Sequence, residues 1–256
     1  AQVNEDPYDD LDGDGHIVLM RRKNPNGRFR VDPTFPQRMV NVGTDEKGDY
    51  EILGLEGKDN DGDGQVNEDG YTFEYDPNRD WGWGWQPNYI QNGAYKYPFS
   101  LPENRNVMNF VMKHPNIAAA QSYHNAGGMI LRGPGAKEDA FDPNDVRVYD
   151  VLGKGGEQLL PGYRYMNIAN DLYEVWGGEV DWLHQVRGTW TFTNELFTPF
   201  NYFRTPGHQG FFGSDEVQHQ FNKYLLLDEG LVPWHEVDHP TYGKVEVGGF
   251  KKTWVR

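Results

Sequence analysis

The chain has 256 residues, a formal net charge of −15, 14% aromatic residues and no cysteine. Its length suits one large domain or two small ones, and its aromatic content argues against disorder. The lack of cysteine excludes disulfides, thiolate metal sites and cysteine nucleophiles. No apolar run approaches the roughly 18 residues of a membrane span, and the acidic balance is unfavourable for nucleic-acid binding.

Two aspartate motifs stand in the acidic first third of the chain, where residues 1–76 hold 19 acidic and 8 basic side chains. They are DLDGDG at 10–15 and DNDGDG at 59–64. Carboxylates at alternate positions followed by glycine are typical of calcium loops, because alternate oxygens converge on one Ca²⁺. The motifs predict one or two structural calcium ions, with the ligands Asp10, Asp12, Asp14, Asp59, Asp61, Asp63, Glu68 and Asp69.

Neither motif is an EF-hand, since the twelfth loop position is Arg21 in the first copy and Gly70 in the second. Both are similar to the shorter calcium loops of dockerin or thrombospondin type 3 repeats. The first copy lacks a clear closing acid, which Glu5, Asp6 or Asp9 could supply from upstream. A solvated acidic turn without an ion is the alternative interpretation.

The first predicted strand is HIVLM at 16–20, between the two motifs. NPNG and DEKGDY, further along, predict turns. The stretch DPNRDWGWGWQPNY is rich in glycine and predicts irregular structure. Regular patterning starts at SLPE, which predicts a helix with Ser100 as its N-cap. Its apolar face would be Val107, Phe110 and Val111.

NIAAAQSY predicts a strand over 116–123 that ends at His124. A helix is expected from about 163 to 176, stopped by two glycines, and its predicted apolar face consists of Ile168, Leu172 and Val175. GTWTFTNELF alternates and predicts a strand, with Trp190 and Phe192 on one side and Thr191, Thr193 and Glu195 on the other. A last helix is expected over 214–227.

Strands that alternate with helices predict an α/β fold. The expected architecture is a mixed central β-sheet flanked by helices, with the acidic calcium loops as insertions. Ligand sites in such folds usually lie at the C-terminal ends of strands. HEVDH at 235–239 satisfies the H-E-x-x-H zinc pattern, but Pro233 and Pro240 disfavour the long helix that the pattern needs. A surface loop is expected there.

Four stretches follow one another from Asp76 onward: DPNRDW at 76–81, SYHNAGGMIL at 122–131, LYEVWGGEVDW at 172–182 and FTNEL at 192–196. In this order they resemble the zinc carboxypeptidase family, the carboxypeptidase A-like metallopeptidases. The resemblance implies one carboxypeptidase-like domain over 1–256, incomplete at its N-terminus, with 1–75 as an acidic calcium-loop region within it. It implies removal of C-terminal residues from peptides, in a secreted, periplasmic or cell-surface protein.

The resemblance also implies a zinc site and its chemistry. His124 is expected to be one zinc ligand, and Asp76 could hydrogen-bond a ligating histidine. Glu195 is expected to act as general base toward the zinc-bound water. An arginine of LMRRKN would polarise the scissile carbonyl, and Arg21 is preferred over Arg22.

Binding of the substrate would fall to other residues of the matched stretches. Arg79 suits the terminal carboxylate because a guanidinium binds carboxylate bidentately, and Asn78 adds a neutral donor. Tyr173 matches the tyrosine that the family closes over the bound residue. Val180 would line the pocket for the C-terminal side chain and favours an apolar or aromatic residue there, although Glu179 stands beside it.

The chain departs from the family at the other two zinc ligands, which come from a His-x-x-Glu motif. The only histidine before Asp76 is His16, and Leu19 follows three residues on. We expect the two missing ligands on a separate N-terminal chain or segment. QVNED at 65–69 follows the second motif and recurs at 2–6, which suggests another such motif upstream. The alternative is a catalytically inactive, calcium-stabilised extracellular scaffold or interaction module.

Overall fold

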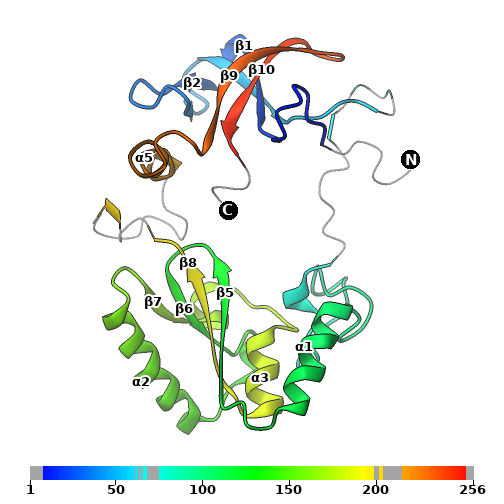
Figure 1. Cartoon of the computed structure of the whole chain (residues 1–256), viewed down its shortest axis with the longest axis vertical. Helices are drawn as coiled ribbons and strands as arrows, with labels where there is room; N and C mark the ends of the chain where they lie inside the picture. The colour runs from blue at the N-terminus through cyan, green and yellow to red at the C-terminus, as the bar shows by residue number, and fades with distance from the viewer. Residues whose placement is uncertain are drawn as a thin grey trace. The chain divides into compact units, whose positions relative to one another are not determined.

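The computed structural model describes residues 8–60, 62, 64, 66–67, 75–198, 202–203 and 215–251. The chain divides into two compact units, and each is described by itself (Figure 1). The first unit comprises Ala1–Thr72 and Ser214–Arg256, and the second comprises Phe73–Gly213. Four of the predicted calcium ligands lie outside the described residues: Asp61, Asp63, Glu68 and Asp69.

The first unit is built on an antiparallel six-stranded sheet with the strand order β3-β2-β4-β1-β10-β9. Its strands are β1 Leu19–Gly27, β2 Phe29–Val31, β3 Met39–Asn41, β4 Gly48–Leu55, β9 Leu231–His239 and β10 Gly243–Phe250. Helix α5, Asp215–Leu225, belongs to the same unit and confirms the last predicted helix. The buried core of the sheet consists of Val18, Met20, Val232 and Val247.

Two local predictions in this unit are wrong. The strand predicted at 16–20 begins at Leu19 and continues through NPNG to Gly27, where a turn was expected. The turn-forming residues are absorbed by a register shift between Lys23 and Gly27, with the Asn26 N–H donating to Asn24 Oδ1 at 2.9 Å. HEVDH forms part of strand β9, paired along β10, so it is neither the zinc-protease helix nor the expected loop.

The second unit is built on a mixed four-stranded sheet with the order β5-β8-β6-β7. Its strands are β5 Ala119–Asn125, β6 Met129–Arg132, β7 Arg164–Asn167 and β8 Trp190–Leu196. Its helices are α1 Pro102–Lys113, α2 Pro143–Leu159 and α3 Glu179–Arg187, with short helical turns at Pro77–Arg79, Lys137–Asp139 and Ile168–Leu172. The strands lie between α2 on one side and α3 and α1 on the other in Figure 1. The predicted mixed sheet flanked by helices is confirmed here.

The helix predicted over 163–176 is wrong. That segment forms strand β7 followed by a π-helical turn, Ile168–Leu172. The three apolar residues on which the prediction depended, Ile168, Leu172 and Val175, still pack into one core cluster with Met129 and Leu131. Apolar residues at helical spacing can therefore reach one core from a strand end and a single helical turn, without a regular helix.

Helix α1 begins differently from the prediction. Its N-cap is Leu101 and not Ser100. The Ser100 backbone N–H and hydroxyl and the Leu101 N–H all donate to the carboxylate of Asp80, at 2.8–3.1 Å. Asp80 is fully buried and thus supplies the cap from a distant part of the sequence. Of the predicted apolar face only Val111 is buried, and the other two residues are exposed.

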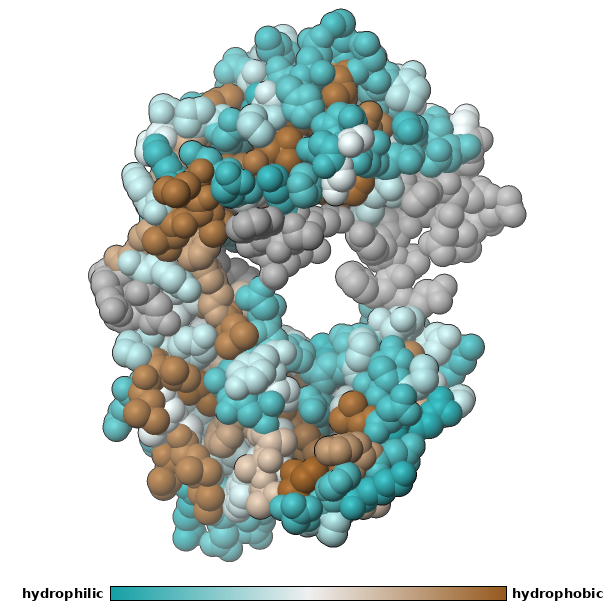
Figure 2. Space-filling model, viewed as in Figure 1, coloured by the Kyte–Doolittle hydropathy of each residue, from teal (hydrophilic) through white to brown (hydrophobic). Residues whose placement is uncertain are grey.

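Apolar surface gathers over helix α2 (Figure 2). The exposed apolar residues of this helix are Val148, Val151, Leu152 and Leu159. None of the described helices combines the length and the apolar character needed to cross a bilayer.

Candidate functional site

Strands β5 and β8 place the predicted zinc ligand and the predicted general base side by side. They pair in parallel, with His124 opposite Glu195 in the register. The side chains approach, with His124 Nδ1 3.7 Å from Glu195 Oε1. The His124 side chain is 39% exposed and the Glu195 side chain 15%. Both residues lie near the C-terminal ends of their strands, where ligand sites of such sheets are found.

Asn78 connects the short helical turn Pro77–Arg79 to this pair. Its backbone N–H donates to Asp76 Oδ1 at 2.7 Å, which fixes the start of the turn. Its side-chain Nδ2 lies 3.4 Å from His124 Nε2. Its Oδ1 accepts the Glu179 N–H at 3.0 Å, at the start of helix α3. The Asn78 amide therefore links the imidazole to the first turn of α3.

Arg79 and the glycine turn after Tyr173 lie in close contact. Gly177 has φ +68°, and a Cβ there would lie 2.5 Å from the Arg79 carbonyl oxygen. Its own carbonyl accepts the Trp81 N–H at 3.0 Å. The Arg79 guanidinium donates to the Asn78 carbonyl at 2.7 Å. Only glycine permits both this left-handed conformation and so close an approach.

One pocket collects the predicted site residues of this unit. Asp76, Asn78, Arg79, His124, Tyr173 and Glu195 all line it. Its apolar lining consists of Leu131, Ile168, Leu172, Val175 and Val180. Tyr173 is 56% exposed, so its side chain is accessible at the pocket. Five loops and strands that are far apart in the sequence thus converge on one hollow.

Two further pocket residues have no role in the sequence-based assignment, Thr193 and Asp181. The alternating pattern of β8 could have identified Thr193 as a site residue, because Thr193 lies on the same face of the strand as Glu195. Trp190 and Phe192 make edge-to-face contacts with Tyr149 from α2 on the opposite face, which confirms the predicted alternation.

Burial favours the protonated form of two acids in the pocket, Glu195 and Asp181. It raises the pKa of the Glu195 carboxyl, and the His124 imidazole partly opposes that shift. Burial also raises the pKa of Asp181 to about 7. Asp181 Oδ2 accepts the Gly135 N–H at 2.9 Å, whereas its Oδ1 has no partner within the described residues. Perturbed acids in one cleft are typical of functional sites.

Arg21 lies in the first unit, on β1, and makes structural contacts there. Its Nε donates to Glu246 at 2.6 Å. Its guanidinium carbon lies 4.3 Å from the ring centre of Tyr50 and 4.1 Å from that of Trp234. Arg22 hydrogen-bonds Glu51. The electrophilic role expected of one of these arginines stays a prediction.

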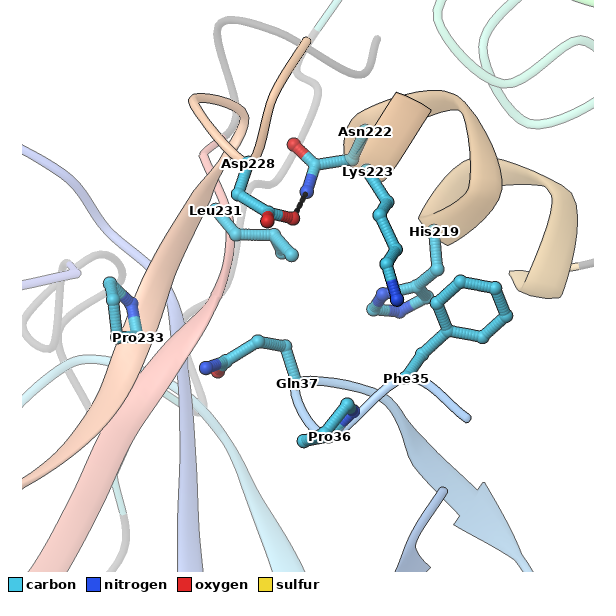
Figure 3. Close-up of a pocket in the computed structure, with 9 residues that line it drawn as sticks. All are labelled: Phe35, Pro36, Gln37, His219, Asn222, Lys223, Asp228, Leu231 and Pro233. Carbon is cyan, nitrogen blue, oxygen red and sulfur yellow. Dashed lines mark hydrogen bonds between the residues drawn. The ribbon is translucent and has the colours of Figure 1, made fainter. Parts of the chain in front are cut away.

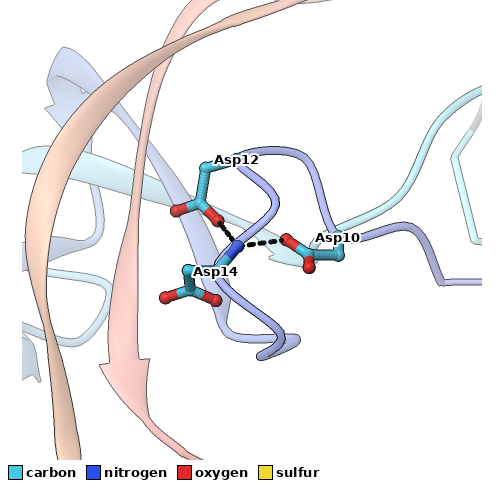
Figure 4. A group of neighbouring side chains, drawn as sticks. All are labelled: Asp10, Asp12 and Asp14. Atoms are coloured by element: carbon cyan, nitrogen blue, oxygen red, sulfur yellow. Dashed lines mark hydrogen bonds between the residues drawn. The ribbon is translucent and has the colours of Figure 1, made fainter.

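Possible metal ligands gather at one place in the described part of the chain. Asp10, Asp12 and Asp14 offer ligand atoms that all lie within 4.8 Å of one another (Figure 4). No other described group brings three such side chains together. Of the predicted zinc ligands, the described residues therefore supply His124 alone.

A second pocket lies in the first unit, between α5, β9 and the segment before β3 (Figure 3). Asn222 closes one side by donating to Asp228 Oδ1 at 2.9 Å. Lys223 Nζ lies 5.5 Å from the ring centre of Phe35. None of the predicted site residues lines this pocket.

Comparison with known proteins agrees with the geometry. The family model for zinc carboxypeptidases matches residues 17–216. Carboxypeptidase A1 of Sus scrofa is 29% identical over 147 residues, which are 53% of this chain and 33% of that protein. Carboxypeptidase A1 of Bos taurus is 24% identical over 177 residues, 57% of this chain and 40% of that protein.

Among solved structures, carboxypeptidase A from Helicoverpa armigera is similar at 22% identity with a TM-score of 0.43. That match covers 59% of this chain and 39% of the other. The chain spans about a third to two fifths of the length of the curated relatives cited above.

Proposed function

The chain belongs to the zinc carboxypeptidase family, and from that premise we propose that it removes C-terminal residues from peptides as part of a metallocarboxypeptidase. One observation carries the proposal. His124 and Glu195 stand opposite each other in a single pocket, with the Asn78 amide in contact with the imidazole. A possible metal ligand, a partly buried acid and a polar anchor in one pocket support hydrolysis of peptides by zinc-bound water.

Substrate binding is proposed for the wall of the same pocket. The Arg79 guanidinium would bind the terminal carboxylate through paired hydrogen bonds, and Asn78 would add a further donor. Tyr173, exposed at the pocket, would close over the bound residue. The apolar lining, with Val180 in it, supports an apolar or aromatic C-terminal side chain.

Glu195 is proposed as the general base. Its buried carboxylate would take a proton from the attacking water and pass it to the leaving amine. Zinc, when bound, supplies a Lewis acid and lowers the pKa of its bound water. His124 would give the metal one imidazole nitrogen, and Arg21, or alternatively Arg22, would polarise the scissile carbonyl.

The described residues fit that zinc site only in part. A catalytic zinc takes three protein ligands, and His124 is one. We propose that a separate N-terminal chain or segment with His-x-x-Glu supplies the others. Strand β5 supports this: it is an edge strand, and Tyr123 on it is 64% exposed. Parallel strands are normally covered on both faces, so β5 offers a surface for such a segment.

Structural calcium is proposed for both aspartate motifs. Asp10 accepts hydrogen bonds from the Gly13 and Gly15 N–H groups, and Asp59 accepts from Gly62 and Gly64 in the same way. The described parts of the two loops therefore share this hydrogen-bond pattern. Calcium loops of modest affinity suit extracellular calcium levels, which supports a secreted, periplasmic or cell-surface location.

We also propose that the two units belong to one carboxypeptidase-like domain over 1–256, with 1–75 as its acidic calcium-loop region. The family match over residues 17–216 supports this, because it runs from the first unit through the second. A calcium-stabilised scaffold without activity is the competing proposal. It is favoured by the single zinc ligand, His124, found in the described residues.

The decisive experiment is a peptidase assay and zinc analysis of the full gene product. Glu195→Gln should lower kcat by about 10²–10⁴-fold while zinc stays bound, because the general base is lost and the ligands remain. His124→Ala should lose both zinc and activity. Glu103→Gln, an exposed acid on α1, is the matched control and should change neither.

Two results would count against the enzyme. Full activity in Glu195→Gln would remove its proposed base. A wild-type protein that binds calcium but neither binds zinc nor cleaves peptides would favour the scaffold. Peptides that end in phenylalanine, leucine or arginine test the proposed specificity, and we expect arginine to be the poorest.

A further inference from the structure

The pocket of the first unit, shown in Figure 3, has no role in the proposed chemistry. Its volume is about 350 Å³, which lies at the lower end of the range found for small-molecule sites. Three stretches far apart in the sequence line it: residues 35–37 before β3, residues 219–228 of α5 and the loop after it, and residues 231–233 of β9. The hollow is therefore a product of the folded unit and not of a single loop.

The apolar part of the pocket wall is preformed. Phe35 and Leu231 are buried, and Pro36 and Pro233 lie at the exposed edge. The Phe35 ring packs against the buried His219 ring, with the ring centres 6.0 Å apart. Proline fixes its own backbone torsion, so the edge has little freedom to move. Such a wall suits an apolar or aromatic group of a ligand.

Lys223 gives the pocket a positive charge. Its Nζ lies 5.5 Å from the ring centre of Phe35 and 5.9 Å from that of Tyr224, so aromatic rings help to hold the ammonium in place. Among the described residues this ammonium has neither an ion pair nor a hydrogen bond. In a protein with a net charge of −15, an unpaired cation at a pocket favours an anionic group of a ligand.

Asp228 gives the pocket a negative charge at a fixed position. The buried Asn222 donates from Nδ2 to Asp228 Oδ1 at 2.9 Å, and its carbonyl accepts the Asp228 N–H at 3.1 Å. These bonds hold Asp228 at φ +69°, a left-handed conformation that is uncommon outside glycine. Within the described part of the chain, Asp228 Oδ2 has no partner and does not pair with Lys223. One carboxylate oxygen is thus held ready for a cationic donor.

Gln37 adds a neutral donor to the same pocket. Its Oε1 accepts the Trp234 N–H at 3.2 Å, which orients the amide. Its Nε2 has no hydrogen-bond partner among the residues that the structure describes. Figure 3 shows Lys223, Asp228 and Gln37 on three different sides of the hollow. The pocket therefore offers separate partners for an anion and for a cation beside an apolar wall.

We propose that this pocket binds a free α-amino acid with an apolar or aromatic side chain. Its carboxylate would pair with Lys223 and accept from Gln37, and its ammonium would donate to Asp228 Oδ2. Its side chain would pack against the apolar wall. A zwitterion is the chemistry that matches two opposite charges that do not pair with each other, whereas a peptide end carries only one of its two charges beside its side chain. The inference goes beyond the proposed peptidase activity, although such a peptidase would release ligands of this class.

The test is isothermal calorimetry of the full chain with L-phenylalanine, with thermal unfolding measured in parallel. The wild type should bind the amino acid and gain in Tm. Lys223→Met and Asp228→Asn should each weaken binding by about five- to tenfold, because each removes a charge-assisted hydrogen bond. Asp228→Asn keeps the acceptor for Asn222 and a residue type that tolerates the left-handed backbone, so its fold should be preserved. Lys113→Met is the matched control, since this exposed lysine lies in the last turn of α1 as Lys223 does in α5, and it should bind as the wild type does.

Ligand analogues test the recognition of the zwitterion. Glycine, N-acetyl-L-phenylalanine and L-phenylalaninamide each lack one of the three recognised groups, and each should bind at least about fivefold more weakly than L-phenylalanine. Binding of N-acetyl-L-phenylalanine as tight as that of the free amino acid would overturn the proposal in favour of a peptide C-terminus. No binding of L-phenylalanine at millimolar concentration would overturn it outright.

Arg79→Met distinguishes this pocket from the proposed peptidase pocket, which Arg79 lines. Binding of L-phenylalanine to this variant should equal binding to the wild type, because Arg79 does not line the pocket of the first unit. Loss of binding in Arg79→Met together with full binding in Lys223→Met would assign the amino acid to the peptidase pocket and overturn the inference. A protein without peptidase activity should still bind the amino acid, so the two proposals can fail separately.

Discussion

Replacing Asp181 by asparagine tests the electrostatics of the pocket most directly. Asp181 is 3% exposed, and one of its oxygens accepts the Gly135 N–H while the other has no partner in the described structure. Burial is the main cause that raises its pKa from 3.8 to about 7, and the charge of Asp139 adds to it. The folded protein should therefore hold this proton well above the pH at which the unfolded chain releases it.

The direction in which stability changes with pH follows from the linkage between folding and proton binding by Asp181. A group whose pKa is raised on folding contributes stability that is complete below the unfolded pKa, here 3.8. That contribution is lost as the pH rises through about 7. At 1.36 kcal/mol per pKa unit, the loss amounts to on the order of 4 kcal/mol. The substituted asparagine side chain has no charge to bury, so the variant should lack this part of the pH dependence.

The asparagine carries its own cost. Its oxygen can still accept the Gly135 N–H, but its NH₂ group would occupy the place of the unpartnered Oδ1 against Gly133. A buried unpaired donor costs about 1–3 kcal/mol at any pH. The stability of Asp181→Asn relative to the wild type should therefore rise by roughly 2–3 kcal/mol from pH 5 to pH 8, and at pH 8 the variant should be at least as stable as the wild type.

Urea unfolding followed by tryptophan fluorescence at pH 5, 6.5 and 8 measures this change, since Trp182 is buried beside the site. Glu103→Gln, exposed on α1, is the control and should follow the wild type at each pH. A stability difference between Asp181→Asn and the wild type that stays constant from pH 5 to 8 would refute the argument. It would mean that Asp181 is already ionised in the folded protein.

Three other changes have expected outcomes in urea unfolding. Asp80→Asn should destabilise by about 2–4 kcal/mol, because a buried charged acceptor at the start of α1 is lost. Gly177→Ala should destabilise by about 2 kcal/mol or more and weaken peptide binding, because its Cβ would collide with the Arg79 carbonyl. Arg21→Met should cost about 2–3 kcal/mol, whereas Arg30→Met, from an exposed pair, should cost under about 1 kcal/mol.

Each of these three has a contradicting result. Wild-type stability in Asp80→Asn would mean that the helix start does not depend on that carboxylate. Wild-type peptide binding in Gly177→Ala would separate the glycine turn from the position of Arg79. Equal losses of unfolding free energy in Arg21→Met and Arg30→Met would show that the burial of Arg21 adds nothing to the stability that its ion pair provides.

Several features could be predicted from the sequence because they depend on local pattern. The alternation in GTWTFTNELF predicts that Glu195 and Trp190 lie on different faces of one strand, and the structure confirms this on β8. The strand before His124 is likewise confirmed, as β5. The four stretches from Asp76 to Leu196 indicate the family that the comparisons show. Each of these signals lies within about ten consecutive residues, where periodicity and residue type are sufficient.

Other features could be decided only by the tertiary structure, because they join residues that are distant in the sequence. The segment at 163–176 has a helical pattern, yet pairing with β6 makes its first part a strand. Asp80 caps a helix 20 residues later, where Ser100 had seemed sufficient by local pattern. The ion pair of Arg21 with Glu246 joins two neighbouring strands from opposite ends of the chain, and no local pattern indicates it.

The aspartate loop shows the same division most clearly. The motif DLDGDG alone places three carboxylates in this loop. For a closing acid, the sequence indicates only residues close by and upstream, Glu5, Asp6 or Asp9. The structure places the backbone of Glu56 between Asp9 and Val18, which flank this loop, because β1 and β4 pair in the sheet. The sequence by itself thus determined which chemical groups this protein has, and the pairing of distant strands decided which of them meet.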